Sequence, residues 1–254
     1  MKKIAVITPY NNEDFNLIKK ANESVKLQSN NQFNCDHIIV VDGQDTNEVL
    51  KKLDCFSLEL KENYQDNGNT PRSVGTNLAI SKNYDFIMYL DADNWFMKNH
   101  AETLFDLIKL EDGIACSYRT FFTMEEQKLD YLEDSDSLKK KHVDTSCYLI
   151  PKKFFKFINI WHLIPKPASQ WCDRIFFHHL NLMQIKFKFS EKHTLAFRTL
   201  YQVHYNNNKN LMPKNSKENS KINERVYDYF SDKNNQETFN NLFNFTFRVK
   251  KNPN

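Results

Sequence analysis

The stretch Phe86–Trp95, with the sequence FIMYLDADNW, passes directly from an apolar run to two carboxylates one residue apart. Residues 85–90 are mostly apolar and predict a short strand. Such apolar strands are typical of a parallel sheet that helices cover on both faces. Ligands of such sheets bind in the crevice beyond the carboxyl ends of the strands. The stretch therefore predicts an α/β fold and places Asp91 and Asp93 at the binding edge of its sheet.

The residues around this stretch repeat a pattern of apolar run, polar loop and helical spacing. We interpret residues 4–8, 37–41, 55–60 and 85–90 as strands, and we expect helices over 14–28, 46–53, 72–82 and through 104–108. Strands that alternate with helices predict a central, mostly parallel sheet flanked by helices. Thr8, Pro9, Asp42 and the acids at 91 and 93 then lie at one edge of the sheet.

The alternation ends after residue 112. Strands are predicted over 114–122, 143–150, 184–189 and 194–203 and a helix over 170–182, whereas the acidic residues 125–136 predict a solvated loop or helix. From residue 206 the chain is polar, with helical segments expected near 226–230 and 239–247. We therefore expect one domain at 1–205, with halves at 1–112 and 113–205, and a polar, partly helical C-terminal tail at 206–254.

Composition limits the choice of partners and compartment. The 254 residues are 40% hydrophobic and carry a formal net charge of +3, which is too mild a charge to indicate nucleic acid as a partner. The five cysteines stand singly, so we interpret them as reduced thiols rather than as a metal or redox site. No apolar run reaches the ~18 residues of a membrane span. We expect a cytoplasmic protein, either free or peripheral at the inner face of the membrane.

Two acids in the spacing D-x-D suggest a cation site. Carboxylate oxygens are the ligands that hard cations such as Mg²⁺ and Mn²⁺ prefer. The alternative is that Asp93 or Asn94 only caps the helix that follows, as polar residues commonly do at helix starts. The spacing alone leaves both interpretations open.

Four stretches in chain order carry a family resemblance. They are ITPYNN at 7–12, VVDGQDT at 40–46, NTPRSVGTNLAI at 69–80 and YLDADNW at 89–95. Together they resemble the family 2 inverting glycosyltransferases of the GT-A fold. The resemblance covers about the first 95 residues and implies that residues 1–112 bind a nucleotide-sugar, while residues 113–205 hold the acceptor.

The resemblance implies a role for each residue at the sheet edge. Thr8 and Pro9 would line the base, Asp42 would accept a hydrogen bond from the base or ribose, Arg72 would lie near the base and diphosphate, Asp91 would contact the ribose, and Asp93 would hold the metal. The metal, Mn²⁺ or Mg²⁺, would neutralise the diphosphate and aid its departure. A fixed cation beside a diphosphate is physically sensible, although Arg72 could equally be a solvated residue of a helix start.

The second half supplies the remaining candidates. Asp173, in WCDR at 171–174, resembles the family's catalytic acid, and we expect it to deprotonate the acceptor hydroxyl. Cys172 departs from the acidic pair common there, and Asp173 could instead cap the helix or pair with Arg174. His204 could be a third metal ligand or a structural histidine. Asp144 could touch the acceptor or cap a turn.

These features predict a metal-dependent inverting glycosyltransferase of the hexosyltransferase type. The donor would be a nucleotide-sugar, most plausibly UDP-linked, and the acceptor a glycan or lipid-linked glycan of surface polysaccharide synthesis. Mixed lysine and aromatic stretches at 139–141, 152–156 and 186–188 could contact an anionic membrane or be ordinary solvated faces. The alternatives are a sugar-phosphate nucleotidyltransferase, which the lack of glycine after the first strand disfavours, and a non-catalytic nucleotide-binding relative.

Overall fold

The first half of the chain forms the parallel part of the sheet. The computed structural model describes residues 1–46, 48–108, 112–132 and 142–245. Strands β1 (Lys2–Tyr10), β2 (Phe33–Val41), β3 (Phe56–Glu59) and β4 (Phe86–Tyr89) lie parallel in the order β3-β2-β1-β4. Because β1 has β2 on one side and β4 on the other, the strand order reverses there, and a crevice opens at their carboxyl ends.

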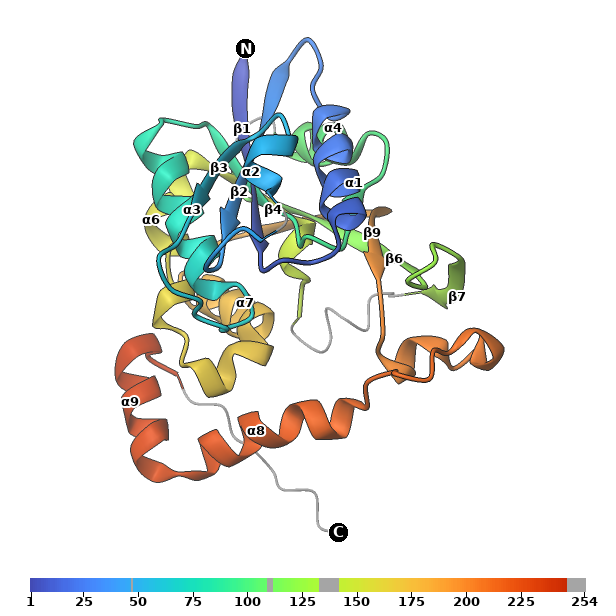
Figure 1. Ribbon diagram of the computed structural model, residues 1–254. Coiled ribbons are helices and arrows are strands. Elements are labelled where there is room, and N and C mark those ends of the chain that lie inside the picture. The colour runs from blue at the N-terminus through green and yellow to red at the C-terminus, as the bar shows by residue number, and fades with distance from the viewer. Residues whose placement is uncertain (47, 109–111, 133–141, 246–254) are drawn as a thin grey trace.

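The helices of this half are α1 (Phe15–Lys26), α2 (Val49–Lys52), α3 (Asn69–Ser81) and α4 (His100–Leu107). They flank the strands, as Figure 1 shows. Helix α3 packs closely on β1, since a Cβ atom at Gly75 would collide with the buried side chain of Ile7. That contact fixes the start of α3, and with it Arg72, beside the end of β1.

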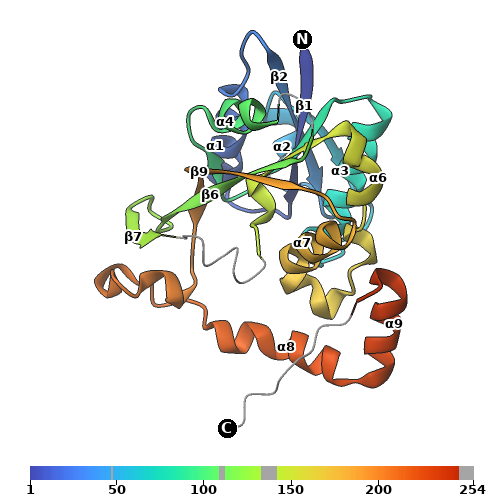
Figure 2. The same cartoon turned by 180° about the vertical axis from the view of Figure 1, so that it is seen from behind.

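The second half extends the same sheet with mixed strand directions. Strand β8 (Tyr148–Pro151) lies antiparallel to β4 and to β6 (Ile114–Phe122), and β9 (Phe187–Arg198) lies parallel to β6. Two short antiparallel strands complete the sheet: β5 (Trp95–Phe96) on β9 and β7 (Lys128–Leu132) on β6. Figure 2 shows β6 and β9 crossing the molecule above helix α7.

The connections of the second half are short helices and 3₁₀ turns. The bounds are η1 (Thr145–Cys147), η2 (Lys152–Phe154), α6 (Phe155–Ile158), η3 (Trp161–Leu163), η4 (Lys166–Trp171), α7 (Cys172–Leu182), η5 (Gln202–Tyr205) and η6 (Lys209–Leu211). Helices α8 (Asn219–Ser231) and α9 (Lys233–Phe243) follow. No helix of the described residues is long and apolar enough to cross a membrane.

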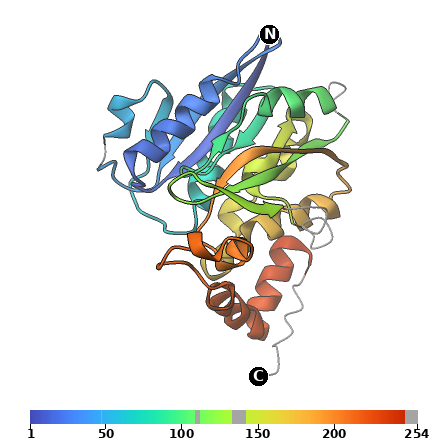
Figure 3. The same ribbon diagram turned by 90° about the vertical axis from the view of Figure 1, so that its right-hand side faces the viewer.

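Helices α8 and α9 confirm the helical segments expected in the C-terminal tail, and they pack on the domain. Figure 3 shows both helices, in orange-red and red, at the end of the molecule opposite the N-terminus. Val226, Phe230 and Phe239 are fully buried, and the indole Nε1 of Trp171 donates to Asn223 Oδ1 at 2.7 Å. This stretch therefore contributes to the core, although the division at residue 205 stays a prediction.

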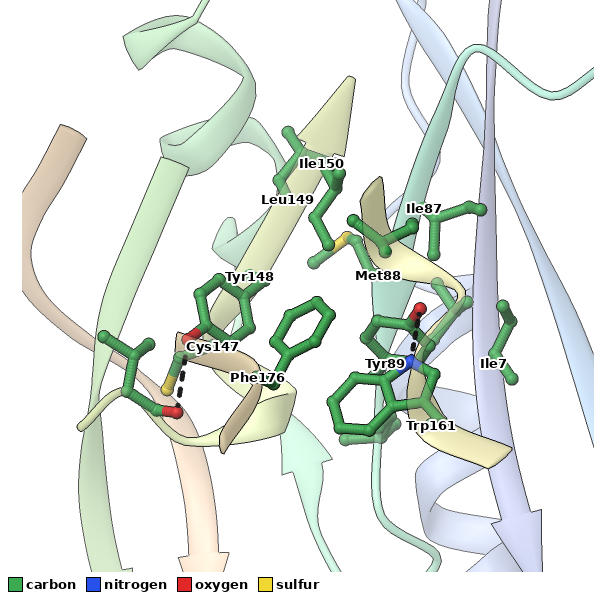
Figure 4. Packing of buried hydrophobic residues seen from close by; sticks show 14 of the residues in the cluster. Ile7, Ile87, Met88, Tyr89, Cys147, Tyr148, Leu149, Ile150, Trp161 and Phe176 are labelled. Carbon is green, nitrogen blue, oxygen red and sulfur yellow. Dashed lines mark hydrogen bonds between the residues drawn. The ribbon is translucent and has the colours of Figure 1, made fainter. Parts of the chain in front are cut away.

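One core joins the two halves of the sheet, as Figure 4 shows. Trp161 stacks on Phe176 with ring centroids 4.2 Å apart, and its Nε1 donates to the Tyr89 hydroxyl at 3.0 Å. Both Trp161 and Tyr89 are fully buried, and burying aromatic side chains of this size is a major source of folding free energy. The strand that precedes the D-x-D acids is thus rigidly anchored.

The structure confirms the predicted α/β class and the parallel arrangement of the first four strands. Four details of the second half were wrong. Within the strand predicted over 143–150, residues 145–147 form the turn η1, and β8 begins only at Tyr148. Residues 128–132 form β7 rather than a solvated loop or helix, residues 187–198 form one strand rather than the end of one and the start of another, and residues 202–205 form a 3₁₀ turn instead of ending a strand. Lys139, Lys140 and Lys141 lie outside the described residues.

Candidate active site

A cavity of about 1060 Å³ lies beyond the carboxyl ends of β1, β2 and β4. The start of α7, the turn η5 and the start of α8 form its opposite wall. Its lining includes seven of the residues expected from the sequence: Pro9, Asp42, Arg72, Asp91, Asp93, Asp173 and His204. The structure therefore brings residues from positions 9 to 204 to one site.

Arg198, the last residue of β9, holds the D-x-D loop in place. The backbone N–H of Arg198 donates to Asn94 Oδ1 at 2.9 Å, and the Arg198 guanidinium donates to the carbonyl oxygen of Asp93. Helix α4 begins only at His100, with Asn99 at its N-cap position. The alternative that Asp93 or Asn94 caps the following helix is therefore wrong.

Four carboxylates face the cavity from the ends of three parallel strands: Glu13, Asp42, Asp91 and Asp93. Burial raises the pKa of Asp93 to about 7, and the negative charges of Asp91 and Glu13 add to the effect. Burial, together with Asp91 and Asp42, likewise raises the pKa of Glu13. Carboxylates that raise one another's pKa in this way would be relieved by a bound cation.

The residues at the D-x-D loop fit a metal that is only partly held by the protein. Among the described residues, no group of three or more His, Cys, Asp or Glu side chains could hold an ion by itself. Mg²⁺ in nucleotide sites is commonly bound by one or two carboxylates together with substrate phosphates. Asp93 and Asp91 supply such carboxylates at the cavity wall, so the ligand set would be completed by the donor.

Arg72 is bound to the same loop. Its Nη2 lies 2.6 Å from Asp91 Oδ1, and its Nη1 donates to the carbonyl oxygen of Asn67 at 2.7 Å. Only 5% of the Arg72 side chain is exposed, so the alternative of a solvated residue is wrong. Gly68, at a φ of +76°, lets the loop approach Pro9, since a Cβ atom there would lie 2.7 Å from Pro9 Cβ.

The Asp42 carboxylate orders the loop that contains Tyr64 and Gln65. Its Oδ1 accepts the N–H of Tyr64 at 2.8 Å and its Oδ2 accepts that of Gln65 at 3.1 Å. Because each carboxylate oxygen has two lone pairs, this arrangement leaves acceptor capacity toward the cavity. Asp42 thus shapes the loop and faces the region where a base is expected.

Thr8 is the exception among the expected donor residues. It is fully buried and does not line the cavity, and its Oγ1 forms a hydrogen bond of 2.7 Å with His37 Nε2. Side chains alternate along a strand, so Thr8 turns into the layer between β1 and α1 while Pro9 faces the cavity. The expectation that the Thr8 side chain lines the base is therefore corrected.

Asp173 faces the D-x-D acids from the first turn of α7. Its Oδ1 accepts the N–H of Arg174 at 2.7 Å, and its Oδ2 contacts the Nε2 of His142. Burial raises the pKa of Asp173, but His142 and Arg174 outweigh burial and hold that pKa below its ordinary value. The side chain is thus an ionised carboxylate at the cavity wall, 23% exposed.

His204 and Asp144 complete the predicted set. Burial, with the positive charges of Arg119 and His142, lowers the pKa of His204 to about 3, and its Nδ1 is 2.7 Å from Thr199 Oγ1. A neutral imidazole is the form that binds metals, and its role as a ligand stays a prediction. Asp144 caps η1 through Ser146 and forms a buried ion pair with Arg119 at 2.9 Å.

Several cavity residues were not foreseen from the sequence. Glu13 follows the end of β1, so the expectation that binding residues lie just after strand ends applies to it as well. Nothing local marks Arg119, His142 or Arg225, because each reaches the cavity through the packing of distant elements. Arg225 lies on α8, which shows that the C-terminal segment forms part of the wall.

The α/β sheet, with acids at a strand-order reversal, is the fold of the GT-A glycosyltransferases, as the following comparisons show. The structure of TarS residues 1–349 from S. aureus is similar to this chain with a TM-score of 0.57 and 15% identity, over 78% of this chain and 60% of that one. A second TarS structure is similar with a TM-score of 0.58 and 13% identity, over 96% of this chain and 43% of that one. The structure of GalNAc-T7 with UDP, GalNAc and Mn²⁺ is similar with a TM-score of 0.58 and 13% identity, over 78% of this chain and 44% of that one.

At these identities the likeness shows the fold alone. The chain spans 60% or less of the length of these three solved chains. No curated protein matches the sequence. Residues 5–168, however, match the profile described as Glycosyl transferase family 2, and the chain belongs to that family.

Proposed function

We propose that this chain transfers a sugar from a UDP-linked nucleotide-sugar to a hydroxyl of a glycan or lipid-linked glycan acceptor, with inversion at the anomeric carbon. The observation that carries the proposal is that Asp173 and the D-x-D acids line one cavity from opposite walls. The family match supports the reaction class. An inverting transfer needs a base on the face opposite the leaving diphosphate, and this arrangement supplies one.

The donor would lie along the carboxyl ends of β1, β2 and β4. Pro9 and Asp42 would contact the base, and Asp91, held by Arg72, would contact the ribose. Asp93 would hold a divalent cation, with His204 as a further candidate ligand, and a bound cation neutralises a diphosphate. GalNAc-T7 was solved with UDP and Mn²⁺, which supports testing this pair first.

The acceptor would enter between α7 and α8. Asp173 would take the proton of the attacking hydroxyl as the acceptor oxygen bonds to the anomeric carbon and the bond to the diphosphate oxygen breaks. The pair His142–Asp173 keeps the carboxylate ionised before attack. An ionised carboxylate at the cavity wall is thus ready to accept a proton.

The direct test measures UDP release from UDP-glucose, UDP-galactose, UDP-GlcNAc and UDP-GalNAc with Mn²⁺, using the wild type and Asp173→Asn. We expect turnover of one donor by the wild type and a loss of about 100-fold or more in the variant, because general bases contribute 10²- to 10⁴-fold. Asp54→Asn is a matched control, since Asp54 is exposed and pairs with Lys26. Full activity in Asp173→Asn would remove the base assignment.

The two alternatives give different results in the same assay. A nucleotidyltransferase would release pyrophosphate from UTP and a sugar phosphate. The residues Asn11–Asp14 after β1 contain no glycine for a phosphate loop, so we expect none. A non-catalytic relative would bind nucleotide and turn over no donor.

A further inference from the structure

His142 and Asp173 come from separate elements and pair at the wall of the cavity. His142 precedes η1, and Asp173 lies 31 residues later in the first turn of α7. The Nε2 of His142 contacts Oδ2 of Asp173, and the other oxygen, Oδ1, accepts the N–H of Arg174. The two side chains are 15% and 23% exposed and both line the cavity.

The backbone beside His142 is fixed by a buried ion pair. Asp144 Oδ2 lies 2.9 Å from Arg119 Nη1, and each of these side chains is only 8% exposed. Asp144 Oδ1 also accepts the N–H of Ser146 at 2.9 Å. Since Asp144 is two residues from His142, this pair anchors the backbone next to the histidine.

We propose that His142 is a positioning residue for Asp173, donating its Nε2–H to Oδ2 so that the carboxylate points at the acceptor hydroxyl. The inference rests on the proposed function, in which Asp173 takes the proton from the acceptor. The acceptor proton moves to the Asp173 carboxylate as the new glycosidic bond forms and the diphosphate leaves with the electron pair of its broken bond. His142 keeps its own proton throughout.

The geometry explains why such a partner is needed. The terminal torsion of an aspartate is broad, so a carboxylate with one partner can rotate away from a reactive orientation. In Asp173 each oxygen has one fixed donor, which leaves the remaining lone pairs aimed by the protein rather than by solvent. A misplacement of about 1 Å can cost 10²-fold in rate.

The surroundings of the pair are charged and polar on every side. Arg174 lies next to Asp173 on α7, and the groups from other elements that interact with the Asp173 charge are Asp144, Tyr148 and Tyr201. Among these neighbours, His142 is the one whose ring nitrogen contacts the Asp173 carboxylate. The other groups change the field at Asp173, whereas His142 also sets its orientation.

The test compares His142→Ala and His142→Gln, with UDP release from the four UDP-sugars above and water as the acceptor. The Gln side chain carries an N–H donor at a reach similar to that of Nε2. We expect kcat to fall about 10- to 100-fold in His142→Ala, with the donor KM unchanged, and to recover most of this loss in His142→Gln. His162→Ala is the matched control, because His162 bonds Ser73 outside the cavity.

Three results would overturn the proposal: a kcat for His142→Ala within twofold of the wild type, equal losses in the Ala and Gln variants, or a loss confined to the donor KM. The first would show that Asp173 needs no partner, and the second that hydrogen-bond donation is not the role. If Asp173→Asn is inactive while His142→Ala is fully active, only this inference fails. If Asp173→Asn is fully active, the assignment of Asp173 as the base fails, and this inference fails with it.

Discussion

Arg72 and Asp91 form an ion pair at the junction of α3 and the D-x-D loop, with 2.6 Å between Nη2 and Oδ1. The guanidinium also holds the carbonyl oxygen of Asn67 at 2.7 Å. One side chain therefore ties together the loop before α3 and the acids after β4. In the proposed function, the donor would bind beside this pair.

Replacing Arg72 tests that role. Arg72→Ala leaves Asp91 beside Glu13 and Asp93 without its cation. We expect a loss of about 1 to 3 kcal/mol in the free energy of unfolding, less than for a fully buried pair because Asp91 is 30% exposed. Arg72→Lys keeps the charge but cannot hold both partners, so urea denaturation should place it between Ala and wild type. A stability of Arg72→Ala equal to the wild type would contradict the assignment.

In EDTA, the Asp93 carboxylate should make the folded protein less stable as the pH rises. Its folded pKa of about 7 lies above the ordinary value of 3.8, so the folded protein binds more protons than the unfolded chain between these values, and stability is lost as the pH rises through this range. We expect Asp93→Asn in EDTA to be more stable than the wild type by about 1 to 2 kcal/mol at pH 8.

The gain from Asp93→Asn should shrink as the pH falls toward 4, where the wild-type carboxyl is protonated in the folded state. Thermal unfolding at pH 8, 6 and 4.5 would follow it, with Asp54→Asn as the control. A gain of the same size at all three values would show that the Asp93 charge is not its source.

The buried side chain of His37 should make the stability of the folded protein fall as the pH falls, which is opposite to the effect of Asp93. His37 is buried between Thr8 Oγ1 and Asn22 Oδ1, and burial lowers its pKa to about 3. The unfolded chain therefore binds more protons below the ordinary pKa of 6.5, and stability falls as the pH drops below that value. Between pH 6.5 and 5.5 we expect His37 to contribute about 1 kcal/mol of this loss.

The measurement for His37 is urea denaturation of the wild type and His37→Gln at pH 7 and 5.5. The variant should lose less stability on acidification than the wild type does. His162→Gln serves as the control because His162 is exposed. An unchanged pH dependence in His37→Gln would contradict the prediction.

The contact between Trp171 and Asn223 couples α8 to the start of α7, where we propose that the acceptor binds. Asn223→Ala removes the acceptor of the indole N–H, which we expect to cost about 1 to 2 kcal/mol in stability. It should lower kcat with nucleotide affinity unchanged, since Trp171 lies two residues before Asp173. Asn240→Ala on the exposed face of α9 is the control. Weakened nucleotide binding in Asn223→Ala would contradict this division of the cavity.

The parallel half was predictable because its signals are local. Apolar runs such as residues 37–41 mark buried strands, and the acids that follow them mark the binding edge. The same reasoning failed for Thr8, because alternation along β1 turns its side chain away from the cavity. It also failed for β7, because its five residues lie within an acidic stretch and pair with the C-terminal end of β6.

The second half was less predictable because its site depends on tertiary contacts. His142 meets Asp173 only after β8 and α7 have packed together, and no spacing in the sequence encodes that approach. Likewise, the sequence of α8 is mostly polar because one face of the helix is exposed to solvent. Its buried face, with Val226 and Phe230, is recognisable only once η4 is in place.

The most direct measurement is the thermal stabilisation by UDP, GDP, CDP and dTDP, each with and without Mn²⁺, of the wild type and of Asp93→Asn. Each shift is taken relative to the same protein without ligand. A nucleotide at ~100 times its dissociation constant adds about 2.7 kcal/mol, a shift of a few degrees. We predict a Mn²⁺-dependent shift with one nucleotide, most plausibly UDP, that is lost in Asp93→Asn. No shift with any nucleotide, or an equal shift in Asp93→Asn, would contradict a donor site at the D-x-D loop.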